Sequence, residues 1–274
     1  MGHTYWSMQK NNKTGIIFIF CILIIALLIR LPHLFDKEKG TDEKLSIRNA
    51  EIIKNFNFSL KDYAKVMPHE ANPPLFFIIL AISLIFYNSI VSLKIVVLII
   101  SLLSIIAFYI LSKEIFGDKF ALFSTLLYSL NPIHLILSQH IRTYILLFLL
   151  FNLSLYFLYR LLIKGDKKSQ VYLIILNIIS IYIHYYSVLF IISEVITAIF
   201  FYKTIKKDIK SYIISIIIIG LMAIPAIILL KTQLNYTSGW GLEKVTFLTL
   251  GYPLYKFSLM VDVSTIIKKF PYIF

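Results

Sequence analysis

An acidic pair, Asp42-Glu43, follows the first apolar run of the chain and is its first candidate for chemistry. Carboxylates are among the side chains that can act as general acids or bases in catalysis. The alternative is purely local, because acids in the first turn stabilise a helix by about 0.3–1 kcal/mol.

Two basic residues stand at the ends of apolar runs, where they could hold an anion. Arg142 belongs to the segment Ser138-Gln139-His140-Ile141-Arg142-Thr143-Tyr144, and His184 interrupts a later apolar run. A guanidinium group has the forked geometry that binds phosphate, and a histidine can donate a further hydrogen bond. Each has a structural alternative, since an arginine at a helix end can snorkel and a histidine among tyrosines can belong to an aromatic belt.

Glu194 lies inside an apolar run, where an ionisable group is costly and is by default a functional candidate. Its structural alternative is a hydrogen bond between helices, with Asn152 or His134 as the partner. The only cysteine is Cys21, and the sequence has no Cys/His metal spacing, no phosphate-binding glycine loop and no nucleophile–base pair. We therefore expect no metal and no cofactor.

These residues are embedded in a chain with the composition of a membrane protein. Of 274 residues, 59% are hydrophobic and 15% are charged, whereas soluble domains are about 45–50% apolar and about 25% charged. A spanning helix needs about 20 apolar residues. We predict an all-α polytopic transmembrane bundle forming a single module over 1–274, with spans near 15–31, 92–112, 120–139, 143–163, 171–184, 187–202, 211–230 and 246–262.

Residues 33–72 form the only long polar loop and should lie outside the cell. This loop contains seven Lys/Arg and seven Asp/Glu residues. Thr41 could cap an amphipathic helix with Asp42 and Glu43 in its first turn and an apolar stripe that includes Ile52 and Ile53. Such a helix would lie along the membrane surface.

The distribution of lysines predicts the orientation. The net charge of +13 comes from short clusters between apolar runs, so nucleic-acid binding is not expected. The segment 73–88 would reach only about 24 Å as a helix, so we expect it to dip into the membrane rather than cross it. The basic loops at 113–119, 164–168 and 203–210 then face the cytoplasm, and the polar motifs gather on the outer face.

In order and spacing, four motifs resemble those of the type C membrane glycosyltransferases, in particular the family 39 branch of protein O-mannosyltransferases and aminoarabinose transferases. The motifs are the acidic pair, His69-Glu70-Ala71-Asn72-Pro73-Pro74-Leu75-Phe76-Phe77, the segment ending at Tyr144 with Asn131-Pro132 before it, and Ile183-His184-Tyr185. The resemblance covers roughly residues 15–230. Members are usually longer, so the chain resembles their N-terminal module, truncated at the C-terminus.

The resemblance implies transfer of a sugar from a polyprenyl-phosphate donor to a hydroxyl of a lipid, protein or glycan acceptor, with inversion, at the outer face of the plasma membrane. Asp42 would be the general base, which accepts the proton of the acceptor hydroxyl, and Glu43 would orient the surrounding loop. Some relatives carry a lysine at the position of Asn72 and an acidic residue near that of Tyr144, so these contacts would differ here. Substrate binding would involve Arg142, His184, Tyr144, Gln139, Asn72, His69 and Glu70.

A transporter or flippase for a lipid or small solute is the alternative function. Glu194 and the broken-looking spans at Asn131-Pro132 and Pro225 favour it, because transporters place discontinuous helices and ionisable groups near the midplane. An inactive fragment is a third possibility. The gathering of polar residues at one face, beside a long loop, favours chemistry at the membrane surface.

Overall fold

The computed structural model of the chain describes residues 2–35, 40–55, 63, 70, 72–200 and 209–236. Helices make up the described part, which confirms the predicted all-α polytopic fold. They are α1 (Gly2–Arg30), the 3-10 helix η1 (Leu31–Phe35), α2 (Gly40–Asn55), α4 (Leu75–Phe86), α5 (Ile90–Phe116), α6 (Asp118–Leu130), α7 (Pro132–Leu137), α8 (Tyr144–Leu162), α9 (Ser169–Ile183), α10 (Ser187–Phe200) and α12 (Ile209–Tyr236).

Four described segments are long and apolar enough to cross a membrane: Gly15–Phe35, Ile90–Phe116, Tyr144–Leu162 and Ile209–Leu234. Three further apolar helices, α4, α9 and α10, are shorter. Many large apolar side chains of α1 and α12 are exposed, as expected where a helix faces lipid. The predicted span near 246–262 lies outside the described residues.

The segment 120–139, which we predicted as one span, is broken into α6 and α7. The side chain of Asn131 caps α7, because its oxygen accepts hydrogen bonds from the backbone N–H groups of Ile133 at 2.9 Å and His134 at 3.2 Å. Pro132 then occupies the first helical position, where a missing N–H does no harm. This local capping overrides the continuous apolar pattern. A turn at His184 separates α9 from α10, between the two spans predicted near 171–184 and 187–202.

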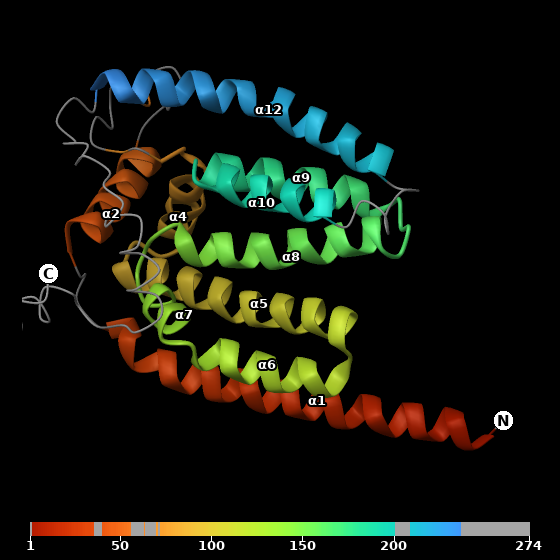
Figure 1. Cartoon of the computed structure of the whole chain (residues 1–274). Coiled ribbons are helices and arrows are strands. Elements are labelled where there is room, and N and C mark those ends of the chain that lie inside the picture. Colours follow the sequence, from red (N-terminus) through yellow and green to blue (C-terminus); the bar gives the residue numbers. More distant parts are fainter. Residues whose placement is uncertain are drawn as a thin grey trace, which may run out of the picture. The chain divides into compact units, whose positions relative to one another are not determined.

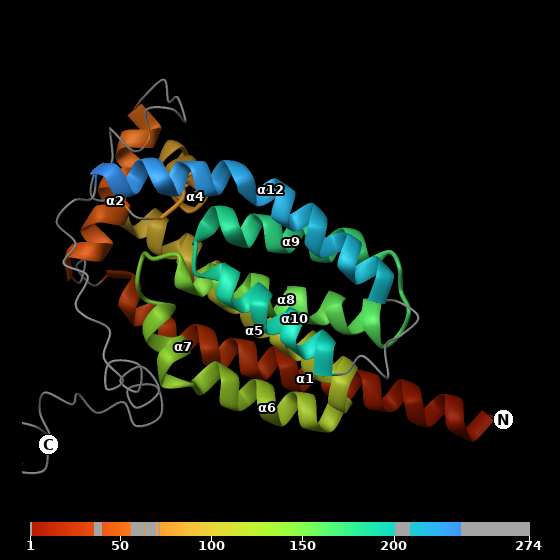
Figure 2. The ribbon, with the colours of Figure 1, turned by 45° about the horizontal axis from the view of Figure 1, so that its top comes forward.

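Figures 1 and 2 show which of the described helices are neighbours. Helix α5 packs against α6 and α8, α8 against α9, and α9 against α12, while α1 lies along α6 and α5. Helix α2 packs against α4. The α5–α6 and α8–α9 connections lie at one end, whereas α2, α4 and α7 lie at the other (Figure 1).

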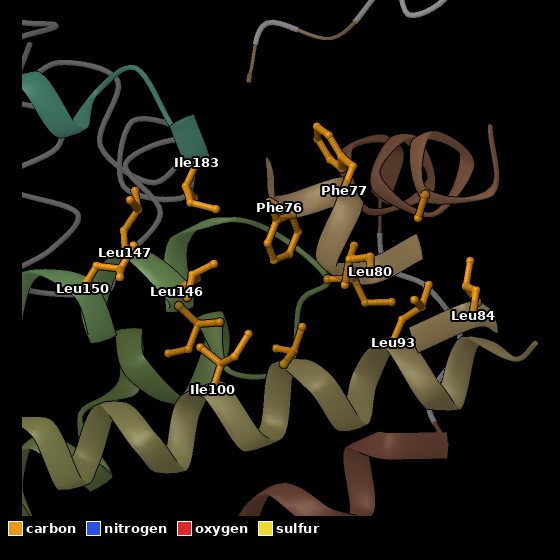
Figure 3. Close-up of a cluster of buried hydrophobic side chains, with 14 of the residues drawn as sticks. Phe76, Phe77, Leu80, Leu84, Leu93, Ile100, Leu146, Leu147, Leu150 and Ile183 are labelled. Carbon is orange, nitrogen blue, oxygen red and sulfur yellow. The ribbon is translucent and has the colours of Figure 1, made fainter. Parts of the chain in front are cut away.

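A buried apolar cluster fixes α4 at this second end (Figure 3). Phe76 and Phe77 of α4 are fully buried and pack edge to face, with ring centroids 5.8 Å apart. Leu93 and Ile100 of α5 and side chains of α8 and α9 complete the cluster. With 12 residues, α4 rises about 18 Å, which is shorter than the hydrocarbon core of a bilayer at about 30 Å. Packing of these side chains against α5, α8 and α9 holds α4 in place.

Candidate functional site

The acidic pair lies in the first turn of α2, where the two carboxylates have opposite environments. The helix begins at Gly40, whose φ of +83° is unfavourable for other residues, so Thr41 lies inside the first turn and does not precede it. The Asp42 side chain is 65% exposed, whereas Glu43 is 2% exposed. An exposed carboxylate can meet a substrate, and a buried one can hold the helix in position.

Glu43 joins α2 to the segment that carries Arg142. Its Oε1 accepts a hydrogen bond of 3.0 Å from the backbone N–H of Ile141. A charged acceptor makes such a bond stronger than one between neutral groups. The contact joins the segment 138–143 to the first turn of α2.

Arg142 reaches across to the same turn of α2. Its Nη1 donates to the backbone oxygen of Asp42 at 3.1 Å and to the Ser46 hydroxyl at 3.2 Å. Its Nη2 lies 3.6 Å from the Asp42 carboxylate. The candidate base and the candidate phosphate ligand therefore lie side by side, although they are 100 residues apart in sequence.

A buried polar network joins α1 and α5 to the bend between α6 and α7. Arg30, at the end of α1, donates through Nη2 to the backbone oxygen of Ser129 at 2.9 Å and contacts Nδ1 of His134 at the same distance. The opposite ring nitrogen of His134 lies 2.7 Å from the Ser104 hydroxyl of α5. These bonds hold the bend between α6 and α7. We did not predict a role for Arg30, although a cation that ends the first apolar run was a usable signal.

His184 lies in the turn between α9 and α10. Burial and, to a smaller extent, the positive charge of Arg142 together lower the pKa of its imidazole to about 4. The ring is therefore neutral near pH 7 and carries one proton. Its Nδ1 accepts a hydrogen bond of 3.2 Å from the backbone N–H of Tyr186, so we assign the proton to Nε2. His184 thus has one N–H with which to bind an anion.

Tyr144 connects the Arg142 segment to the His184 turn. Its ring lies against that of His184, with centroids 5.5 Å apart. Three buried donors near these two segments have no hydrogen-bond partner within the described structure, namely Nε of Arg142 and the hydroxyls of Thr143 and Ser187. Buried donors are normally satisfied. These unpaired donors mark the corner formed by the Arg142 segment and the His184 turn as a candidate binding site.

Glu70 and Asn72, expected to bind substrate, are buried and bonded to protein groups. Glu70 accepts hydrogen bonds from Asn49 at 2.8 Å and from the backbone N–H and the side-chain amide of Asn72 at 2.9 and 2.7 Å. Gln139 is half-buried and lines a small cavity together with Arg30 and Lys94. His69 lies outside the described residues. Glu70 and Asn72 thus stabilise the loop before α4, a function that its sequence did not reveal.

Glu194 does not belong to this corner, and its predicted partners were wrong. It lies about two helical turns beyond Ser187 in α10 and accepts hydrogen bonds from Ser154 at 2.6 Å and Asn177 at 2.9 Å. Asn152 instead donates to Tyr128. The interaction between helices is present, but its donors come from α8 and α9 at other positions.

No group of three or more His, Cys, Asp or Glu side chains that could hold a metal ion occurs among the described residues. The assembled side chains are instead those of acid–base chemistry and anion binding. They comprise one exposed carboxylate, one buried carboxylate, one guanidinium group and one neutral imidazole.

Comparison with known proteins gives one match. The model of a family described as dolichyl-phosphate-mannose-protein mannosyltransferase matches residues 71–228, which is more than half of the chain. The matched range includes Arg142, Tyr144 and His184, whereas Asp42 and Glu43 precede it. No curated protein and no solved structure matches the chain.

Proposed function

Because the chain belongs to the dolichyl-phosphate-mannose-protein mannosyltransferase family, we propose that it transfers a sugar from a polyprenyl-phosphate carrier to an acceptor hydroxyl group, with inversion, at the outer face of the plasma membrane. Membership makes the chain an integral membrane glycosyltransferase that uses a lipid-linked sugar. The observation that carries the finer proposal is the pairing of Arg142 with Asp42, at 3.6 Å. That pairing brings an anion-binding cation next to an exposed base.

Asp42 is the general base of the proposed reaction. Its carboxylate takes the proton of the acceptor hydroxyl while the hydroxyl oxygen forms a bond to the anomeric carbon of the sugar. The bond between that carbon and the carrier phosphate breaks at the same time, and the phosphate leaves with the electron pair. The 65% exposure of the Asp42 side chain supports this role, because an acceptor can approach it from the surface.

Arg142 and His184 stabilise the departing phosphate. Charge develops on the phosphate oxygens as the bond breaks, and fixed donors aimed at those oxygens lower the barrier. The guanidinium group offers a forked pair of N–H donors, and the neutral His184 offers Nε2–H. The unused hydroxyls of Thr143 and Ser187 are further donors close to these residues in sequence. Phosphate is already a good leaving group, so no general acid is required.

The acceptor is a hydroxyl-bearing lipid, protein or glycan. Glu43 does not compete with Asp42 for this acceptor, because it is buried and bonded to the backbone of Ile141. The alternative of a transporter loses support, since Glu194 is bound by Ser154 and Asn177 and lines neither the Arg142 segment nor the His184 turn.

The decisive experiment is Asp42→Asn in purified protein reconstituted into vesicles. Transfer from polyprenyl-phosphate mannose to a peptide containing serine and threonine should fall about 10²-fold or more per folded molecule. Glu43→Gln should reduce transfer less, because its oxygen can still accept the Ile141 N–H. Asp118→Asn is the matched control: it removes a first-turn carboxylate of α6, which pairs with Lys113 at 2.8 Å near the α5–α6 connection. Full activity in Asp42→Asn would remove the base from the mechanism.

A further inference from the structure

Gln233 makes hydrogen bonds to two distant parts of the chain. It lies near the C-terminal end of α12, which Figure 1 places at the same end of the unit as α2 and α4, and it is 2% exposed. Its side-chain N–H groups donate to the backbone oxygens of Glu70 at 2.9 Å and Asn72 at 3.0 Å. Its oxygen accepts a hydrogen bond of 2.6 Å from the hydroxyl of Tyr185.

Each of these partners leads to one side of the candidate site. Tyr185 follows His184 directly, so its hydroxyl anchors the turn that carries the imidazole. On the other side, the Glu70 carboxylate accepts a hydrogen bond of 2.8 Å from Asn49. Asn49 lies seven residues after Asp42, which places it about two turns further along α2. A continuous set of contacts therefore runs from the His184 turn to the helix that carries the acidic pair.

Tyr63 reinforces the middle of this set. Its hydroxyl donates to the backbone oxygen of Asn72 at 2.9 Å. Burial raises the pKa of Tyr63, and the nearby carboxylate of Glu70 raises it further, so the hydroxyl stays protonated and able to donate. We call the six residues Asn49, Tyr63, Glu70, Asn72, Tyr185 and Gln233 the Gln233 cluster.

We infer that Gln233 is a positioning residue, which sets the position of the His184 turn relative to α2. It thereby sets the position of the phosphate-binding residue His184 relative to the base Asp42, an inference that rests on the proposed function. The other hydrogen bonds described between α9 and α12 come from Gln170 and Tyr182 and do not involve the backbone of Glu70 or Asn72. The residue lies beyond the range 71–228 that the family model matches.

Only a primary amide suits this position. Two carbonyl oxygens face the Gln233 nitrogen and one hydroxyl faces its oxygen, so the site needs two donors and one acceptor at the end of one side chain. Glutamate would place negative charge against two carbonyl oxygens. Methionine has a similar length but lacks the donors, so it would leave the carbonyl groups of Glu70 and Asn72 with fewer partners.

The test compares Gln233→Met with Gln170→Met. Gln170 donates from α9 to the backbone oxygen of Ser211 in α12 at 2.9 Å, so it joins the same two helices near their other ends. A second pair compares Tyr185→Phe with Tyr182→Phe, since the Tyr182 hydroxyl bonds to the Met222 backbone oxygen of α12 at 3.0 Å. Each control removes a similar hydrogen bond between α9 and α12 but none of the hydrogen bonds of the Gln233 cluster.

Two measurements are made on the full chain in lipid nanodiscs. Amide hydrogen exchange over 40–55 and 183–187 reports the two tethered segments and needs no substrate. We expect exchange there to accelerate about tenfold in Gln233→Met and to stay unchanged in Gln170→Met. Transfer from polyprenyl-phosphate mannose should lose about tenfold or more in kcat with a smaller change in the donor KM, because misplaced groups lose transition-state alignment.

The outcomes separate this inference from the proposed function. Equal exchange and equal transfer in Gln233→Met and Gln170→Met would overturn the inference. Faster exchange in Gln233→Met alone would support the tether even if the wild-type protein transferred no mannose, a result that would count against the function instead. Adding Tyr185→Phe to Gln233→Met should change neither measurement further, since both remove the same link, and additive losses would contradict the shared role.

Discussion

The Arg142 guanidinium group lies 3.6 Å from the Asp42 carboxylate and also donates to the Asp42 backbone oxygen at 3.1 Å. These contacts bind the guanidinium group to the first turn of α2. A donor phosphate offers a more highly charged acceptor for the same forked donors. We therefore expect the carrier phosphate to draw Nη2 away from Asp42 and leave the carboxylate free to take a proton.

Replacement of Arg142 should impair use of the donor. Arg142→Ala should lower kcat/KM for the lipid-linked sugar about 10²-fold, as loss of a transition-state donor does. Arg142→Lys should retain more of the wild-type kcat/KM than Arg142→Ala but not all of it, because lysine lacks the forked pair of N–H donors. Arg160→Ala is the matched control, since Arg160 lies in the last turn of α8, the helix that follows the Arg142 segment, and pairs with Asp166 at 3.0 Å. Wild-type kinetics in Arg142→Ala would show that the arginine only anchors its segment to α2.

His184 should make the stability of the protein depend on pH. Its pKa is lowered from 6.5 to about 4 in the folded protein, so the unfolded chain binds a proton that the folded chain excludes. The free energy of unfolding should therefore decrease as the pH falls from 6.5 to about 4, where only the unfolded chain binds the proton. Above pH 6.5 neither state binds it, so this pH dependence should be absent. In His184→Gln, the glutamine oxygen can accept the Tyr186 N–H, and the slope should flatten. Thermal unfolding between pH 7.5 and 4 in detergent measures both; an unchanged slope would contradict the assignment.

Glu194 should contribute to stability rather than to transfer. Glu194→Ala should leave Ser154 and Asn177 without their acceptor and lower the free energy of unfolding by about 1–3 kcal/mol. Glu194→Gln should be milder, because its amide can donate to the Asn177 oxygen, which has no partner in the described structure. Ser193→Ala is the control, since Ser193 bonds only to the backbone of its own helix. Loss of transfer in folded Glu194→Gln would reveal a chemical role.

The predicted orientation is testable with single cysteines. After the exposed Cys21 is replaced by serine, a cysteine at Lys167, in the α8–α9 connection, should react only from the cytoplasm. One at Lys44, exposed on α2, should react from outside. The reason is the preference of short lysine-rich loops for the cytoplasm. Labelling of both positions from one side of intact cells would exclude the proposed arrangement.

The class of the protein and several local features could be predicted from the amino-acid sequence alone. Long apolar runs without charge can only be helices in a bilayer, because their backbone groups must bond within the segment. The acids Asp42 and Glu43 lie in a first helical turn, as predicted, because the signals that begin a helix are local. Asn131-Pro132 carried an equally local signal, an N-cap followed by proline, but we read it only as an irregularity within one span.

The hydrogen bonds between distant polar groups depend on the packing of the helices and could not be predicted from the sequence. Glu43 contacts Ile141 from 98 residues away, and Gln233 contacts Glu70 from 163 residues away. Glu194 accepts hydrogen bonds from Ser154 and Asn177 rather than from the partners we expected. The physical reason is that lipid-facing and helix-facing sides of these helices are both apolar, so hydrophobic periodicity does not define which faces pack. Scattered polar side chains find their partners only once the packing of the helices has fixed their positions.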